Sequence, residues 1–409
     1  MKRLIPLCAG RPAQVTLIAA LVLGSSEAAA QEPASAEAAK KPWYESIEFS
    51  AFVDAYFSVN LNFPKPVRGT NALRGNDPNN GFALAQAGGD FTYAPDPVGA
   101  TISLRFGPQA IAYALYDAEQ NVGLEYLRQA YATWKPIDML AIDFGKWDTF
   151  MGGEYIESWS NYNYTRGVLH WLAQPAFHSG LRVTLTPYDE LTLLAFGANG
   201  SNRTLDNNAG KTFGFQVAVT PVESFFASAG YIFGPEQDDT DAVTAAPLVV
   251  ADRGANKRFK HVIDLLINWK PTEQLGFLLN ADLGYEKVVV DPVTGGTDNM
   301  SWSGVMLGAR YAFSDHFATA LRGEFYRDPD GYTSGTGVDL SLVTGTLTIE
   351  ASPDPHFIVK LDGRIDRAFA SDDPADPTDD ENNQIFLKGI DGGRSIQPTI
   401  TLGIVAKTN

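Results

Sequence analysis

The chain has 409 residues, and its 48 acidic residues outnumber its 31 Lys and Arg residues to give a net charge of −17. This balance argues against nucleic acid as a partner, because phosphate binding requires a basic surface. The only cysteine is Cys8, so the rest of the chain offers neither a disulfide nor a thiolate metal site, and we expect no cofactor.

The first thirty residues have the pattern of a secretory signal peptide. Lys2, Arg3 and Arg11 form a basic region, an apolar run covers 15–24, and three alanines precede Gln31. We therefore predict a signal peptide at 1–30 and a short periplasmic lead-in at 31–43. The apolar run is far shorter than the ~20 residues that a membrane-spanning helix needs. The pattern predicts an exported chain without a helical anchor.

From residue 44 onward, runs of alternating apolar and polar residues are separated by breaks of two kinds. The short breaks usually combine proline with an acid, which favours a tight turn, because proline presets φ and the acid hydrogen-bonds to the local backbone. They lie at 94–97, 135–138, 186–189, 220–223, 270–273, 314–316 and 352–355. The long breaks alternate with them at 64–81, 108–123, 148–179, 200–211, 235–258, 287–300, 328–337 and about 369–394. Seven short turns and eight long loops connect sixteen strands.

The strand faces and the prolines support the same architecture. In the first strand the odd positions from Ile47 to Leu61 are apolar, whereas Glu48, Asp54 and Asn60 lie on the other face. After residue 43 every proline except Pro398 falls in a break, because a central strand cannot lose a hydrogen-bond donor. Short turns at one end and long loops at the other are typical of bacterial outer-membrane barrels. We predict an all-β fold: a transmembrane antiparallel β-barrel of about 16 strands over 44–409, with short periplasmic turns, long extracellular loops and outer-membrane lipid around it.

The longest connection, about 148–179, is too polar for a core and too long for a hairpin. We predict that it folds into the lumen and that residues 152–174 form the constriction. The predicted constriction residues are Glu154, Glu157, Tyr164, Arg166 and, on the following strand, Arg182. Charges in a narrow eyelet should outweigh those in outer loops, because the outer charges are screened by salt.

Residues 161–166, NYNYTR, and 174–182, QPAFHSGLR, resemble the OmpL-like outer-membrane β-barrel porin family. In that family a loop containing Gly and Glu, here 152–154, leads into such an Asn-x-x-Tyr-x-Arg segment. The resemblance implies a channel. The chain ends in 406–409, AKTN, whereas many outer-membrane barrels end in an aromatic residue, so we expect the details of assembly recognition to differ.

Strand parity places charges of both signs in the lumen. The predicted lumen residues are Asp54, Asp282, Arg322, Glu324, Lys360, Asp362 and Arg364, and the wider set adds Arg105, Arg310, Asp143, Asp264, Glu286 and Asp366. We predict a porin whose water-filled channel lets small hydrophilic solutes and ions diffuse passively, with a mild cation preference because acids outnumber bases. Monomer and homotrimer both stay open.

Two other functions stay open as alternatives. A channel selective for sugars would use aromatic faces such as Trp159 and Trp171, and one selective for anions would need a ladder of bases, of which the sequence has few. An outer-membrane hydrolase would need a nucleophile bonded to a base, and the adjacent His178 and Ser179 do not establish one. We expect no catalytic residues.

Two acidic runs, 235–241 and 371–383, carry much of the negative charge. We predict that both are exposed loops. A divalent-cation site of carboxylate oxygens is the alternative for each run, although we expect no metal centre.

Overall fold

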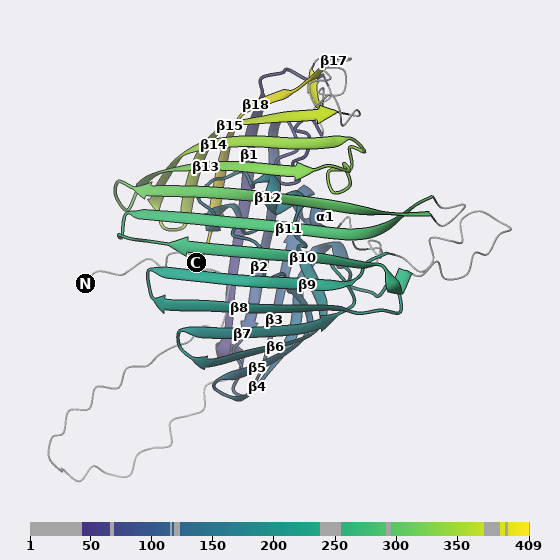
Figure 1. The fold of residues 1–409 in the computed structure, drawn as a ribbon. Helices are drawn as coiled ribbons and strands as arrows, with labels where there is room; N and C mark the ends of the chain where they lie inside the picture. Colours follow the sequence, from purple (N-terminus) through teal and green to yellow (C-terminus); the bar gives the residue numbers. More distant parts are fainter. Residues whose placement is uncertain are drawn as a thin grey trace, which may run out of the picture.

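The computed structural model describes residues 43–65, 69–114, 117, 123–237, 255–291, 296–371, 385–388 and 392–408. The predicted signal peptide and nearly all of the lead-in lie outside these residues. Sixteen strands of the described part form one closed antiparallel barrel, in which β1 (Ile47–Asn60) pairs with β18 (Ile396–Lys407) to close the wall. Figure 1 shows the strands side by side around this wall.

Consecutive strands pair with each other around the barrel, so the connections are hairpins. The remaining strands are β2 (Gly81–Tyr93), β3 (Val98–Phe106), β4 (Leu127–Ile137), β5 (Leu140–Asp148), β6 (Phe177–Tyr188), β7 (Leu191–Ala198), β8 (Thr212–Val222), β9 (Phe225–Pro235), β10 (Phe259–Trp269), β11 (Leu275–Asp291), β12 (Gly296–Ala312), β13 (Phe317–Asp328), β14 (Asp339–Asp354) and β15 (Phe357–Ser371). The predicted fold class and the count of sixteen strands are confirmed.

Side chains alternate between the outside and the inside of the barrel. In β13, Leu321 and Phe325 are exposed on the outer face, whereas Arg322 and Glu324 are buried inside. Closure leaves no strand edge, so the backbone donors and acceptors of the strands pair within the wall, as a lipid surrounding requires. None of the helices in the described ranges has the length and apolar character to span a membrane.

Two connections differ from the prediction. The predicted loop 287–300 is largely strand, since Val288 pairs with Asp298 and Val289 with Thr297 before the connection at 292–295. The β-branched run 288–290 favours extended structure, which outweighed the charged and glycine-rich signal for a loop. In the predicted loop 369–394, β16 (Phe386–Lys388) and β17 (Gly392–Arg394) form a separate small sheet. The acidic residues 372–383 and 238–241 lie outside the described residues.

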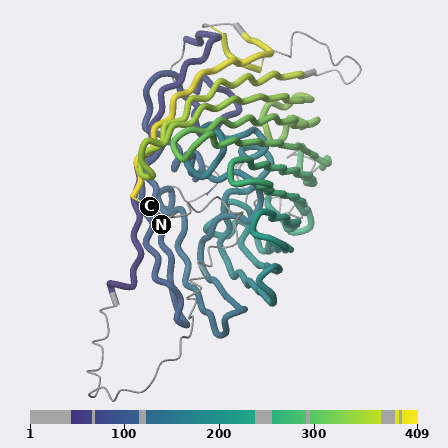
Figure 2. The backbone as a smooth tube through the Cα atoms, turned by 90° about the vertical axis from the view of Figure 1, so that its left-hand side faces the viewer, coloured from purple at the N-terminus to yellow at the C-terminus, as the bar shows by residue number. Residues whose placement is uncertain are grey.

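Short helices occur before β1 and in the long connections. They are η1 (Trp43–Ser46), α1 (Pro108–Ala114), η3 (Leu124–Tyr126), η4 (Ser158–Ser160), α2 (Val168–Leu172) and η5 (Ala255–Lys257). η4 and α2 belong to the connection between β5 and β6, which we call the in-folded loop (149–176). In Figure 2 part of the blue chain lies between the purple strand at the left and the green strands at the right.

The interior of the barrel is apolar on one side. Phe196 of β7, Leu266 of β10 and Met306 of β12 point inward and share one buried cluster with Phe150 and Leu169 of the in-folded loop. The inward face is therefore polar along strands such as β1 and β15, as predicted, and largely apolar along β7 and β12. A small cavity of about 20 Å³ lies between this wall and the loop, where Leu266, Leu278 and Met306 line it together with polar groups of the loop.

Candidate functional site

The in-folded loop crosses the barrel and is hydrogen-bonded to the wall at β1 and β15. The Tyr164 hydroxyl donates to Asp54 Oδ1 over 2.6 Å, and the Ser158 hydroxyl donates to Asp54 Oδ2 over 2.7 Å. Lys360 Nζ of β15 donates to the Ser158 carbonyl over 3.1 Å. These contacts hold the loop against the inner face of the wall.

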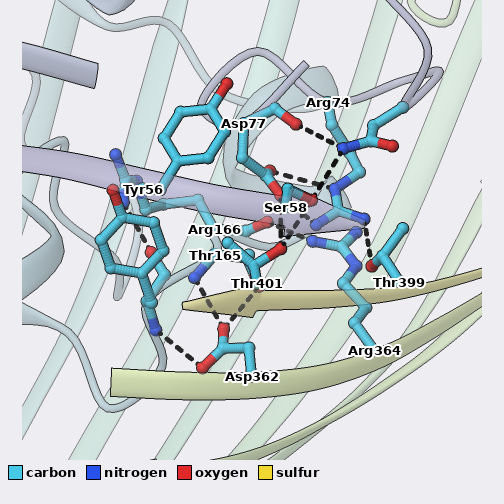
Figure 3. Close-up of polar contacts among 12 residues, drawn as sticks. Tyr56, Ser58, Arg74, Asp77, Thr165, Arg166, Asp362, Arg364, Thr399 and Thr401 are labelled. Atoms are coloured by element: carbon cyan, nitrogen blue, oxygen red, sulfur yellow. Dashed lines mark hydrogen bonds and ion pairs between the residues drawn. The ribbon is translucent and has the colours of Figure 1, made fainter. Parts of the chain in front are cut away.

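Charged side chains of β15 satisfy the backbone of the loop. Asp362 Oδ2 accepts hydrogen bonds from the Thr165 amide and hydroxyl, each over 2.8 Å, and Arg364 Nη1 donates to the Arg166 carbonyl over 2.6 Å (Figure 3). Bonds with an ionised partner are stronger than neutral ones, and an irregular loop buried in a barrel needs such partners. Asp362 and Arg364 therefore fix the path of the loop.

A buried ion pair fixes the loop to β13. Arg322 Nη1 lies 2.6 Å from Glu154 Oε1, and Glu154 Oε2 accepts a hydrogen bond from the Gly167 amide over 2.6 Å. Glu324 Oε1 accepts from the Leu169 amide over 3.2 Å. Removing one partner of a buried pair leaves an uncompensated charge, so these groups depend on one another.

Residues 69–80 of the first loop, which joins β1 and β2, also fold inward and pack beside the in-folded loop. Arg74 forms an ion pair with Asp77 and donates to Thr399 Oγ1 over 2.8 Å (Figure 3). With the Asn76 amide oxygen turned toward Arg166, that oxygen accepts from Arg166 Nε and Nη2 at 3.1 and 3.0 Å. Arg166 is thus held between two loops.

Four charged residues meet where the in-folded loop approaches β3, β4 and β5, and we call Arg105, Arg128, Asp148 and Glu157 the constriction cluster. Arg105 Nη2 lies 2.9 Å from Glu157 Oε1, and Arg128 Nη2 lies 2.7 Å from Asp148 Oδ2. Arg128 also pairs with Glu157. Burial raises the pKa of the Glu157 carboxyl, but Arg128 and Arg105 more than offset this and lower it to about 2.

Two cavities border the constriction cluster, and both are lined by Arg105, Arg128 and Asp148. The larger, of about 300 Å³, extends toward the short-turn ends of the strands, where Thr92 and Lys407 line it. The smaller, of about 30 Å³, lies on the side of α1 and η3. The cluster therefore stands between two hollow regions of the barrel.

The predicted constriction residues fall into two groups. Glu157 and Arg182 line the larger cavity, whereas Glu154, Tyr164 and Arg166 lie buried in the contacts that hold the loop. The predicted lumen residues are buried inside the barrel: Asp54, Arg322, Glu324, Lys360, Asp362 and Arg364 contact the in-folded loop directly, and Asp282 accepts a hydrogen bond from Gln174 of the loop over 2.6 Å. Their roles in permeation stay predictions.

Sequence reasoning missed Arg128. Ser103 pairs with Gln129 and Leu104 with Leu127, so Arg128 is an extra residue at a β-bulge between β3 and β4. A bulge interrupts the alternation of faces, and parity along the strand then assigns the wrong side. Neither the acidic residues nor the arginines nearby in the sequence indicated that Arg128 points inward.

His178, which a hydrolase would use, is a buried packing residue. Its ring nitrogens lie 3.1 Å from the Gly200 carbonyl and 3.3 Å from Thr149 Oγ1, and its ring packs at 4.5 Å against Phe196. A fully buried imidazole offers no surface to a substrate. Within the described ranges, no group of three or more His, Cys, Asp or Glu side chains could hold a metal ion.

Residues 46–407 match the family described as "Putative beta-barrel porin-2, OmpL-like". The chain belongs to this porin family. It is an outer-membrane channel protein, in agreement with the barrel and with the resemblance in 161–182. A search of curated proteins returns no match to the sequence of this porin.

Solved structures of other outer-membrane proteins share the fold. The outer membrane channel DcaP of Acinetobacter baumannii has a TM-score of 0.57 at 10% identity, covering 88% of this chain and 97% of that one. An anion-selective porin from Comamonas acidovorans has 0.53 at 10% identity, covering 89% and 99%. OmpT of Vibrio cholerae in its trimer form has 0.52 at 12% identity, covering 88% and 99%. Such low identities show likeness of fold alone.

Proposed function

We propose that water, ions and small hydrophilic solutes diffuse passively through the sector between the in-folded loop and β1–β6, and pass the constriction cluster. The two cavities that border the cluster carry this proposal. On the opposite side, the loop packs against apolar side chains of the wall. A hydrated solute would therefore take the polar side, where charged and hydroxyl groups can replace its water shell.

The charges along this route are nearly balanced. The constriction cluster holds two guanidinium groups and two carboxylates, and Arg182, paired at 2.8 Å with Asp143, lies beside them. Most of the acids on which the predicted cation preference depended contact the in-folded loop instead. We therefore expect weak ion selectivity that depends on the cluster, since only charges next to the passing ion act on it at short range.

Neutralising Glu157 tests this assignment. Glu157→Gln leaves an excess of positive charge on Arg105 and Arg128, so the reversal potential in a KCl gradient should shift toward anions. In water, a unit charge about 4 Å from a passing ion changes the energy of that ion by about 1 kcal/mol. This energy corresponds to roughly a fivefold change in the permeability ratio.

The matched control is Glu154→Gln, which makes the same chemical change on the β13 side of the loop. Its partner Arg322 retains Glu324 at 3.3 Å, so the reversal potential of the folded variant should stay at the wild-type value. Equal shifts in the two variants, or a shift with Glu154→Gln alone, would place the passage elsewhere.

A solute-selective channel is the second candidate, because aromatic groups line the larger cavity. Trp159 packs at 4.4 Å against Phe52, and Arg182 lies 5.4 Å from the centre of the Tyr131 ring. Sugars stack on aromatic faces, and a binding site would cause a saturable block of ion current. Current that falls only in proportion to solution conductivity when a sugar is added would favour passive diffusion.

We propose that the channel works without catalysis, because the buried His178 ring packs against Phe196 in the barrel interior. A homotrimer is the assembly that we propose to test first, because the fold is shared with an outer-membrane protein solved in trimer form. The molar mass of the purified protein in detergent, measured by light scattering, decides between monomer and trimer.

A further inference from the structure

Glycines occupy inward positions of the wall where the in-folded loop touches it. Gly403 of β18 faces Tyr164, Gly230 of β9 faces Phe150, and Gly304 of β12 faces Leu169. Each of these three glycines contacts a large side chain of the loop. The three contacts come from well-separated strands of the barrel.

A larger residue at any of these positions would collide with the loop side chain unless that side chain moved. A Cβ atom at Gly230 or Gly304 would lie 2.5 Å from the ring of Phe150 or from Leu169 Cδ1, and a Cβ atom at Gly403 would overlap the Tyr164 ring more severely. Real Cβ contacts are essentially never below 3.0 Å. The close approach of the loop therefore favours glycine at these three positions.

The contact at Gly403 cannot relax easily. The Tyr164 hydroxyl is bonded to Asp54, and the Tyr164 amide donates to Asp362 Oδ1 over 3.3 Å. Moving the ring away from the wall would break one or both bonds. Glycines on the outer face differ, because Gly323, Gly345 and Gly363 have nothing within 4 Å of an added Cβ.

We propose that Gly403, with Gly230 and Gly304, forms sockets in the wall that seat the in-folded loop and thereby set the width of the passage. Tyr164 follows η4, whose Trp159 and Ser160 line the larger cavity together with Glu157. Gly403 is thus a positioning residue that acts through Tyr164. The effect on conductance rests on the proposed diffusion route, whereas the seating of the loop does not.

The test is a mutant cycle of Gly403→Ala and Tyr164→Ala, with Gly363→Ala as the matched control on the adjacent strand. In Gly403→Ala the added methyl group should push the loop away from the wall, so that the loop no longer narrows the larger cavity. We expect roughly twice the wild-type conductance and more current noise. Gly363→Ala should behave as wild type. In the Tyr164→Ala background, Gly403→Ala should have no further effect on conductance or on melting temperature, since the clash is absent.

The outcomes separate the two proposals. If Gly403→Ala matches Gly363→Ala in conductance and melting temperature, or keeps its full effect without Tyr164, the socket is wrong. If Gly403→Ala does not fold, restoration of the heat-modifiable barrel by Tyr164→Ala supports the socket, and failure to restore it overturns the socket. Coupling in melting temperature without any change in conductance upholds the socket and overturns the proposed route.

Discussion

At the scale of single residues, Glu157 is held ionised by its neighbours. Its pKa of about 2 lies below the ~4.3 of an unperturbed glutamate. A carboxyl whose folded-state pKa is depressed contributes stability above the unfolded pKa and loses it as the pH falls through the folded pKa. That contribution is therefore complete above about pH 4 and disappears toward pH 2.

The same argument predicts how selectivity depends on pH. Because Glu157 keeps its charge, the shift in reversal potential between wild type and Glu157→Gln should be equal at pH 7 and at pH 4. Planar-bilayer recordings at both values measure this directly. A difference that fades near pH 4 would mean that Glu157 behaves as a solvent-exposed carboxylate without its arginine partners.

Parity along strands correctly placed the charged residues of β1 and β15 inside the barrel, but it could not say what they contact. Asp54 and Tyr164 are separated by 110 residues, and their hydrogen bond depends on the path of an irregular loop. The same limit explains why Glu154 and Glu157, three residues apart, were predicted to share one role. In the structure Glu154 forms an ion pair with β13, whereas Glu157 forms ion pairs with β3 and β4.

At the scale of elements, the in-folded loop is held by charged groups on one side and by apolar packing on the other. Phe150 and Leu169 lie in the buried apolar cluster, whereas Thr165 bonds to Asp362. The polar composition of 148–179 predicted a loop in the lumen and hid this apolar contact. Turn chemistry predicted the strand count well, because proline and acid at the turns are local signals.

Removing the middle of the in-folded loop should open the channel. With 154–170 replaced by a short flexible linker, Asp54, Arg322 and Asp362 would face water, which can hydrate them inside a wide barrel. We expect a several-fold higher single-channel conductance. Neutralising the acids of 372–381, predicted to be an outer loop, serves as the control and should leave conductance unchanged at physiological salt, because the Debye length is about 8 Å.

A folded deletion variant with wild-type conductance would contradict the placement of the route beside the loop. Heat-modifiable migration in electrophoresis checks that the barrel has formed.

At the scale of the whole molecule, the asymmetry of the connections defines which end of the barrel faces the cell surface. The breaks with proline and acid all lie at one end, and the in-folded loop and the first loop enter from the other. Such asymmetry places the short turns in the periplasm. The apolar outer face, with exposed residues such as Leu321 and Ile349, suits the lipid between the two ends.

Cysteine labelling tests this orientation cleanly, because the only native cysteine is Cys8, in the predicted signal peptide. Leu205 lies 53% exposed in the connection between β7 and β8, and Asp315 is exposed in the short turn between β12 and β13. A membrane-impermeant maleimide, too large for the constriction, should label Leu205→Cys in intact cells. It should label Asp315→Cys only after the outer membrane is permeabilised. The opposite pattern would show that the barrel has the inverse orientation. Labelling of both variants in intact cells would show that the constriction does not exclude the reagent.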